Sequence, residues 1–458
     1  MFRHTFRSLA VRNFRLFVIG QVFSVTGTWM MLVAQDWLVL SLSGDSATQL
    51  GIVTGLQFAP VLLLTLHGGT LADRWDRRRL LAVANGIAAL LAALVFLVAV
   101  GPGLRLWHLY VFATALGMVT AVEAPTRMAL VGELVGAELL PNASALSGAY
   151  FNVARMVGPA LAGLLIGRLG AASVFLLNAV SYGATVASVA LMREHERCSV
   201  HPRSDRHRRS SGVTAGLRHV LGRSDLLLPL ALLAVVGSFG FNFQLTLPVL
   251  AKAEFGTGPA SFGLLTSALA AGSLGAALVT TARVRRPTAG VVIGASALFG
   301  LCETASGLAP TFALTLVALA ATGFGAGYFA QATNHRVQLG SDPRYRGRVL
   351  ALYVVIFQGS TPLGALPLGP LVEAEGARSG LLAGGLVTLA ASAAALVWAR
   401  RSDPPEYRLT GAAGEELNTL HGRHPGHVRR PVLRGTERAG GAAGRRGRGG
   451  FRGRPRGR

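Results

Sequence analysis

Charged side chains inside long apolar stretches are the residues of this sequence best placed to do chemistry. Asp36 and Arg155 each stand in such a stretch. A charge in apolar surroundings is costly unless it has a partner or a function. A desolvated carboxylate can exchange a proton, which makes Asp36 the candidate proton-coupling residue; a residue wetted at an interface is the alternative. Arg155 could attract an anionic substrate group or pair structurally with a carboxylate.

Uncharged polar residues share these apolar stretches. Gln21 lies in the same run as Asp36, and Asn152 lies one helical turn before Arg155. We predict that both amides contribute to proton coupling or to binding a small molecule. Glu303 lies near the end of another run and is a weaker candidate for the same role.

A short polar loop, 69–79, separates two of the apolar runs and follows the pattern Gly-x-x-x-Asp-Arg-x-x-Arg-Arg. Gly69 would let two helices approach closely. Asp73 could cap the positive end of a neighbouring helix, worth about 0.3–1 kcal/mol. Arg74 and Arg77 could reach carboxylates or carbonyls in one conformation and release them in another. The alternative is that these arginines only determine membrane topology.

Glu123 lies at the predicted end of a further apolar run and is followed by Pro125-Thr126-Arg127. A carboxylate at such a position is costly unless it is paired. We predict that it pairs with Arg74 or Arg77 in an outward-facing state and latches the two halves of the protein together. The alternative is that the Glu123 side chain extends to the membrane interface, where water solvates its charge.

Two stretches combine glycine and proline within apolar runs. Pro159 lacks an amide hydrogen and should bend its helix, while Gly158 and Gly163 permit close packing against a neighbour. The stretch 359–370 contains Pro362, Pro367 and Pro370, which make a straight helix improbable. We predict a flexible gating helix there, with a simple packing kink as the alternative.

Composition explains what must position these residues. Hydrophobic residues make up 51% of the 458 residues, charged residues only 14%, and the mean hydropathy is +0.47, whereas a soluble domain carries about 25% charged residues. Apolar runs of about 20 residues can cross the hydrocarbon core as helices. The sequence predicts twelve spans, at roughly 14–42, 48–70, 79–101, 105–130, 143–168, 171–192, 225–250, 259–282, 287–308, 311–335, 347–371 and 378–399.

The net charge of +23 comes mostly from arginines in short loops on one face and in the segment after Ala399. This asymmetry predicts that the basic face is cytoplasmic, and an even number of spans then places both termini there. The first apolar run is too long for a cleaved signal peptide, so we expect a retained helix. Cys198 and Cys302 suggest neither a disulfide framework nor a metal site.

A polar stretch divides the spans six and six. We predict an all-α polytopic fold with domains at 1–192 and 225–399, joined by a cytoplasmic linker, 193–224, which contains a short surface helix. A weak internal echo at an offset of 212 residues relates 50–55 to 262–267, as expected for parallel repeats. The Arg/Gly-rich tail, 400–458, is predicted to be disordered and to lie against anionic lipid; RNA binding or no selected function are the alternatives.

Signatures of enzymes do not occur. The sequence lacks a Gly-x-x-x-x-Gly-Lys-Ser/Thr phosphate loop, which argues against an ATP-driven pump. Its single lysine, Lys252, falls in a predicted outer loop rather than in mid-span, which argues against a retinal Schiff base. No metal-ligand spacing or nucleophile elbow is present. We therefore expect a non-enzymatic protein without cofactor or metal.

Several motifs resemble those of major facilitator superfamily transporters, and in particular the enterobactin-exporter-like branch that exports drugs and siderophores. The similarity covers about residues 1–400. It rests on Arg12-Asn13-Phe14-Arg15-Leu16-Phe17, Gly20-Gln21, Gly27-Thr28-Trp29-Met30, the loop 69–79, Pro125-Thr126-Arg127, Asn152 to Gly163 and Arg346-Gly347-Arg348-Val349. Asp76 stands where the family pattern usually has glycine, and Ala145 and Ala154 where its fuller fifth-helix motif has glycines.

The resemblance implies a monomeric secondary transporter in a bacterial inner or plasma membrane. It would export a drug, siderophore or hydrophobic metabolite in exchange for protons, by rocking of two six-helix halves. Uptake of a sugar or metabolite is the alternative within transport. A non-transporting membrane scaffold or receptor is the alternative of another class, and a lipid flippase also fits. Nucleic-acid partners are not expected for the membrane domain, and the sequence does not reveal the substrate.

Overall fold

A computed structural model describes residues 6–193, 213–281, 286–342 and 345–401, and these residues are helical or connect helices. Residues 402–458 of the predicted tail, 400–458, and the linker residues 194–212 lie outside this range. The chain begins with a short 3₁₀ turn, Arg7–Ala10. A first helix group follows, consisting of α2 (Arg12–Ser43), α3 (Ala47–Arg74), α4 (Arg77–Val100), α5 (Leu106–Leu169) and α6 (Ala171–Ala190).

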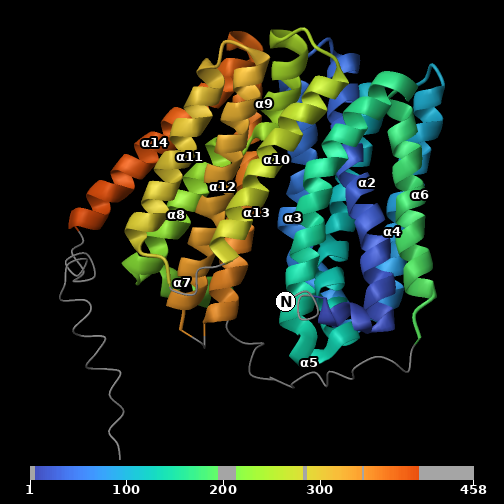
Figure 1. The fold of residues 1–458 in the computed structure, drawn as a ribbon, viewed down its shortest axis with the longest axis horizontal. Helices are drawn as coiled ribbons and strands as arrows, with labels where there is room; N and C mark the ends of the chain where they lie inside the picture. The colour runs from blue at the N-terminus through green and yellow to red at the C-terminus, as the bar shows by residue number, and fades with distance from the viewer. Residues whose placement is uncertain (1–5, 194–212, 282–285, 343–344, 402–458) are drawn as a thin grey trace, which may run out of the picture. The chain divides into compact units, whose positions relative to one another are not determined.

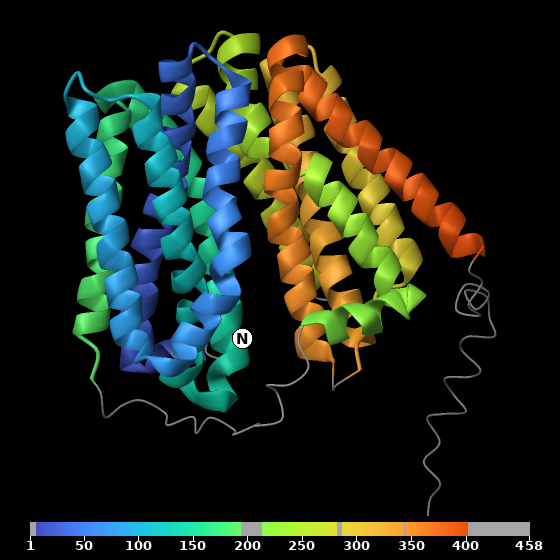
Figure 2. The same cartoon turned by 180° about the vertical axis from the view of Figure 1, so that it is seen from behind.

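The second helix group follows the short helix α7 (Val213–Leu221), which forms part of the predicted linker. It consists of α8 (Ser224–Phe239), α9 (Phe243–Val249), a π-helical turn (Leu250–Glu254), α10 (Pro259–Thr281), α11 (Ala289–Leu308), α12 (Phe312–Gly340), α13 (Arg346–Glu375) and α14 (Ala377–Arg401). The two groups are seen from opposite sides in Figures 1 and 2.

The number of membrane crossings depends on α5, which is 64 residues long. At 1.5 Å per residue it would extend about 96 Å, some three times the hydrocarbon core. Gly136, with φ 71° and ψ 176°, interrupts the helical backbone and separates two arms. Eleven helical segments in the described ranges are long and apolar enough to cross a membrane, counting α5 once. Its two arms raise the total to twelve and correspond to the predicted spans 105–130 and 143–168.

The predicted span 225–250 differs from the structure in its middle. The chain leaves helical geometry at residues 240–242, between α8 and α9, although no proline lies there. Pro229 and Pro248 instead lie inside helices. A break within a membrane helix is tolerated where the freed backbone groups are buried in protein. Glu303 of α11 lies beside this break.

The proline-rich stretches remain helical. α13 continues through Pro362, Pro367 and Pro370 as one helix, and Pro159 lies within the helical second arm of α5. The non-helical torsions of α5 fall at Gly136. These prolines therefore do not break α5 or α13.

The internal echo coincides with contacts between the helix groups. Gly51 of α3 packs on α13, where an added Cβ would lie 2.7 Å from the Ala365 carbonyl oxygen. Its counterpart in the echo, Gly263 of α10, packs on the second arm of α5, where a Cβ would overlap the Pro159 carbonyl oxygen. Glycine permits both close approaches because it has no side chain. The two related positions therefore play the same packing role.

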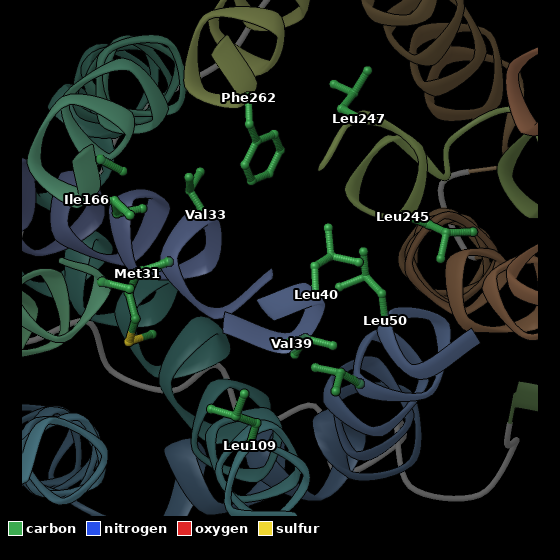
Figure 3. Packing of buried hydrophobic residues seen from close by; sticks show 14 of the residues in the cluster. Met31, Val33, Val39, Leu40, Leu50, Leu109, Ile166, Leu245, Leu247 and Phe262 are labelled. Carbon is green, nitrogen blue, oxygen red and sulfur yellow. The ribbon is translucent and has the colours of Figure 1, made fainter. Parts of the chain in front are cut away.

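Buried apolar side chains from both groups form one cluster. Met31, Val33, Leu40 and Leu50 of the first group share it with Leu245, Leu247 and Phe262 of the second, as Figure 3 shows. Large apolar side chains such as Leu97 and Val180, which are 65% and 64% exposed, face away from the other helices. Such exposure suits contact with lipid. The structure is thus the all-α polytopic fold that the sequence predicts.

Candidate functional site

The helix groups are joined at one end by an ion pair that involves the only lysine. Lys252 Nζ, in the π-helical turn, lies 2.5 Å from Asp45 Oδ1 in the loop after α2. The ammonium group also lies 5.3 Å from the centre of the Trp37 ring and donates a 3.4 Å hydrogen bond to Ser41 Oγ. We call the end of the bundle that contains this pair the latch end.

Asp45 has an uncommon backbone conformation, with φ 67°. This left-handed region is unfavourable for most residues with a side chain, and aspartate is among those that tolerate it best. Gly44, which precedes it, has φ 66°. The chain therefore reverses sharply at the residue that binds Lys252, and such backbone geometry is frequent at functional contacts.

A second contact between the groups lies at the same end. Glu373 Oε2 on α13 accepts hydrogen bonds from Ser46 Oγ, at 2.8 Å, and from the Thr48 amide, at 2.9 Å. Ser46 is the N-cap of α3 and also accepts a hydrogen bond from the Gln49 amide. A carboxylate at a helix N-terminus is stabilised by the free amides and by the helix dipole.

The π-helical turn that carries Lys252 is held within its own group. Arg378 Nε at the start of α14 lies 2.6 Å from Glu254 Oε1, and its Nη1 donates a 2.8 Å hydrogen bond to the Ala309 carbonyl. Its guanidinium carbon lies 5.8 Å from the centre of the Phe255 ring. These contacts fix the position from which Lys252 reaches Asp45.

The loop 69–79 lies at the opposite end, which we call the basic end. Arg77 Nη1 lies 2.6 Å from Glu133 Oε1, and its Nη2 lies 3.5 Å from Asp73 Oδ1. Asp76 caps α4 by accepting a hydrogen bond from the Arg79 amide. Arg78 donates 2.7 Å hydrogen bonds to the last carbonyls of α6. These contacts all lie within the first helix group.

In the described conformation Glu123 pairs within its own helix, and its predicted pairing with Arg74 or Arg77 in an outward-facing state stays a prediction. Glu123 Oε1 lies 3.0 Å from Arg127 Nε, one turn further along α5, while Arg77 pairs with Glu133 and the side chain of Arg74 is exposed. Glu133 was missed because the sequence alone does not show which turn of α5 faces α4. Because Glu123 and both arginines belong to the first group, a pair among them cannot by itself latch the two groups.

The packing role predicted for Gly69 belongs to its neighbour. A Cβ at Gly68 would overlap the Ala121 carbonyl oxygen of α5, whereas one at Gly69 would have nothing within 4 Å. The prediction was one residue out because helix ends are hard to place from sequence, and a shift of one residue turns a side chain by about 100°.

The second group has its own ion-pair cluster at the basic end. Asp225 Oδ2 lies 2.7 Å from Arg223 Nη2 and 2.8 Å from Arg286 Nη2. The hydrogen bond to Asp225 raises the pKa of Arg223, which precedes α8. Arg286 stands 212 residues after Arg74, the offset of the internal echo. Asp225, like Glu133, was not selected from the sequence.

Midway along the helices, Arg155 and two aromatic rings come together. The Arg155 guanidinium carbon lies 5.7 Å from the centre of the Trp29 ring, and Trp29 packs edge-on against Phe151 with ring centres 6.0 Å apart. Within the part of the chain that the structure describes, no carboxylate pairs with Arg155.

Asp36 lies two turns along α2 from Trp29 and therefore on the same side of that helix. Its side chain is 6% exposed, and no hydrogen-bond or ion-pair partner for it occurs among the described residues. Next to it, Gln35 donates a 2.9 Å hydrogen bond from Nε2 to Gln57 Oε1 on α3. One side of α2 thus carries the buried carboxylate of Asp36 and the ring of Trp29, against which Arg155 of α5 lies.

The predicted amides are not part of this arrangement. Asn152 uses its Nδ2 in a 2.8 Å hydrogen bond to the Gly148 carbonyl of its own helix. Gln21 is 2% exposed, and its Nε2 has no partner within the described ranges. Gln21 lies about two turns before Trp29 along α2, whereas Asp36 lies two turns after it. The amide and the carboxylate are therefore about four turns apart and do not form one site.

The Gly-Pro stretch of α5 lies against both α2 and α10. A Cβ at Gly158 would lie 2.8 Å from the Trp29 Cβ, and one at Gly163 would lie 2.5 Å from the Pro259 carbonyl oxygen of the second group. Together with Gly263 against Pro159, these contacts bring the stretch into the boundary between the groups. Substitutions here would change how α5 packs on α10.

Metal chemistry finds no support in the residues described. They contain no group of three or more His, Cys, Asp or Glu side chains arranged to hold a metal ion. The site consists of single charges, aromatic rings and closely packed glycines at the boundary between two helix groups. Such an arrangement suits binding and conformational change.

Comparisons with known proteins agree with this description. The chain is 28% identical over 393 residues to the multidrug efflux pump Tap of Mycobacterium tuberculosis (strain ATCC 25618 / H37Rv), covering 80% of this chain and 89% of that protein. It is 25% identical over 355 residues to macrolide efflux protein A of Streptococcus pyogenes, covering 76% and 86%. Over 256 residues it is 27% identical to the staphyloferrin A transporter of Staphylococcus aureus (strain NCTC 8325 / PS 47), covering 55% and 63%.

Solved structures share the fold. A bacterial homologue of the human lysosomal transporter Spinster, in an inward-facing and unoccupied conformation, superposes with a TM-score of 0.68 at 13% identity, covering 85% of this chain and 96% of that one. A bacterial homologue of the iron transporter ferroportin, in an inward-facing state, gives 0.63 at 17% identity, covering 84% and 98%. The family model described as transmembrane secretion effector, MFS_3, matches residues 3–405. The chain is therefore a multi-pass membrane protein of the transmembrane secretion effector family, within the major facilitator superfamily of transporters, and not an enzyme.

Proposed function

We propose that this transporter exports a small organic molecule in exchange for protons, with Asp36 as the proton-exchanging group. The observation that carries the proposal is that buried Asp36, which has no partner among the described residues, lies two turns along α2 from Trp29, whose ring centre lies 5.7 Å from the Arg155 guanidinium carbon of α5. Asp36 and Trp29 are about 10 Å apart along the axis of α2. In a low-dielectric interior, a proton exchanged at Asp36 and a ligand bound beside Trp29 can therefore influence each other.

The substrate would have an apolar, flat part and an acidic group. Trp29 and Phe151 offer aromatic faces, and Arg155 offers a cation without a carboxylate partner among the described residues. The names of the relatives, which include a multidrug efflux pump, a macrolide efflux protein and a staphyloferrin A transporter, support a small organic molecule as the substrate.

The direction of opening follows from the positions of the contacts. Ion pairs and hydrogen bonds join the groups at the latch end, whereas the arginine pairs at the basic end stay within one group. If the basic end is cytoplasmic, as the distribution of arginines favours, this conformation is closed to the outside. Both termini would then be cytoplasmic. The protein would act as a monomer surrounded by lipid in a bacterial plasma membrane.

Transport into or out of proteoliposomes with an imposed pH gradient tests the proposal. A panel of drugs, siderophores and acidic aromatic metabolites would be offered, and efflux, uptake and no flux would be distinguished. Export driven by the gradient is expected. We expect Asp36→Asn to abolish pH-driven transport while downhill exchange persists, and Glu138→Gln, at a carboxylate that is 84% exposed, to change neither. Unchanged coupling in Asp36→Asn would remove Asp36 from the mechanism.

A further inference from the structure

A second buried carboxylate lies in the other helix group. Glu303, in the last third of α11, is 2% exposed. Its Oε2 has no hydrogen-bond partner within the described ranges. A bare carboxylate in such a place costs several kcal/mol or more, so it must be neutralised by a bound cation.

Backbone atoms of two other helices lie beside Glu303. A Cβ placed on Gly384 of α14 would lie 2.6 Å from Glu303 Oε1 and 2.7 Å from the Phe239 carbonyl oxygen of α8. The carboxyl group and this carbonyl therefore share the space that glycine leaves open. One turn further along α14, Thr388 Oγ1 is also buried without a partner among the described residues.

Phe239 is the last residue of α8, directly before the break at 240–242. No backbone amide of the following turn is found bonded to its carbonyl in the described part of the chain, whereas the preceding Val236 carbonyl accepts a 2.7 Å hydrogen bond from the Gly240 amide. Broken helices in transporters present such carbonyls to coupling ions. The break thus supplies an acceptor beside the carboxyl group.

Apart from Tyr328, near the middle of α12, the other charged and titratable groups on the packed elements lie toward the helix ends, and they include Arg400 and Arg401 in the last turn of α14. α8 carries Asp225 at the basic end, paired with arginines. α12 carries Tyr328, His335 and Arg336 in the half nearer the basic end, and α14 carries Arg378 at the latch end, bound to Glu254 and to backbone carbonyls. Cys302 is the neighbour of Glu303 on α11 itself.

We propose that Glu303 is a proton-binding site at the break of the seventh membrane segment, with the Phe239 carbonyl as the acceptor for the carboxyl O–H. A proton fits better than a metal cation, because hard cations need a shell of six or more oxygens and the groups identified here are one carboxylate, one carbonyl and the Thr388 hydroxyl. On uptake an O–H bond forms on the carboxylate, and on release it breaks and the proton passes to water.

The location gives this proton a mechanical effect. Residues 240–242 join α8 to α9, and α9 leads directly into the turn that holds Lys252. An O–H donated to the Phe239 carbonyl, at the α8 side of the break, stabilises the present geometry of the break. The ionised carboxylate would instead repel the carbonyl oxygen. Protonated Glu303 therefore favours the closed latch between Lys252 and Asp45. This effect requires neither Asp36 nor a particular direction of transport.

Infrared difference spectroscopy of the full chain in lipid vesicles, between acidic and alkaline buffer, tests whether Glu303 binds a proton. A band of a protonated carboxyl group is expected in the wild type and in Asp36→Asn, and it should be lost in Glu303→Gln. Gly384→Ala, which places a methyl group between the carboxyl and the carbonyl, should shift the band. Gly294→Ala on α11, where a Cβ meets nothing within 4 Å, should leave it unchanged. An identical difference spectrum in Glu303→Gln would overturn the proposal.

Spin labels on Leu42 and Gly258, in a chain whose cysteines are replaced, then report the latch. The wild type should shift toward the open latch in alkaline buffer, while Glu303→Gln should keep the closed-latch distance in both buffers. If Glu303→Gln does not insert, Gly384→Ala serves as the second variant and should reduce the pH-induced shift severalfold. A pH-induced shift in these variants equal to that of the wild type would overturn the link to the latch.

Discussion

Lys252 and Asp45 connect the two helix groups through a contact of 2.5 Å, at the end of the bundle opposite the arginine-rich loop 69–79. This latch lies away from the loop, at which a contact of Glu123 with Arg74 or Arg77 is predicted for the outward-facing state. Glu373 supports it from α13 by capping the N-terminus of α3. The loop and its arginines organise the first group, whereas the contacts that must break when the latch end opens involve a single lysine and two carboxylates.

Breaking the latch should favour the state open at that end. Lys252→Ala or Asp45→Ala should each cost the closed state about 0.2–1 kcal/mol, because the pair is partly exposed to solvent. The ratio of closed to open molecules should fall by a factor of about 1.4 to 5, as measured by spin-label distances across the latch. The exchange Lys252→Asp with Asp45→Lys should restore much of it. A double variant no better than either single variant would show that the ion pair does not hold the groups together.

Arg77 and Glu133 should act as a structural pair of the first group. Their side chains are 25% and 23% exposed, so removing one partner leaves a poorly solvated charge, and we expect a loss of about 1–3 kcal/mol. Thermal unfolding in detergent should show lower midpoints for Arg77→Ala and Glu133→Ala, with a non-additive double variant. Glu123→Ala is the comparison: if it, and not Glu133→Ala, were non-additive with Arg77→Ala, the pairing would be wrong.

Two adjacent glycines should respond oppositely to alanine. Gly68→Ala introduces a Cβ that overlaps the Ala121 carbonyl oxygen, so α3 and α5 must move apart. We expect folded yield and melting temperature to fall clearly. Gly69→Ala adds a methyl group in open space, and its effect should stay within about 0.5 kcal/mol. Equal melting temperatures for the two variants would contradict the packing of α3 on α5.

Arg155 should determine how acidic substrates are held. Arg155→Gln removes the cation but keeps a polar side chain over Trp29. For a transported compound with an acidic group, we expect KM to rise about tenfold or more, as for the loss of a charge-assisted hydrogen bond worth about 1.5–3 kcal/mol. For a neutral analogue KM should change little, and Arg155→Lys should recover part of the loss. An equal rise for both compounds would indicate a structural role instead.

The positions of the membrane helices could be predicted from the sequence, whereas the positions of breaks within them could not. Long apolar runs located the membrane helices because the requirement to satisfy every backbone group in lipid acts locally. The break at 240–242 escaped notice because no proline lies there, and the prolines of α13 did not interrupt that helix. Whether a helix breaks depends on the neighbours that accept its freed backbone groups.

The sequence by itself determined the all-helical membrane fold, the family, and the short set of polar residues worth testing, including Asp36 and Arg155. Only the tertiary structure decided the partners: Glu133 for Arg77, Arg127 for Glu123, Asp45 for Lys252, and the free carbonyl beside Glu303. The physical reason is that hydrophobicity is a property of each segment alone. An ion pair depends on which faces of distant helices meet, and a rotation of one residue exchanges one candidate for another.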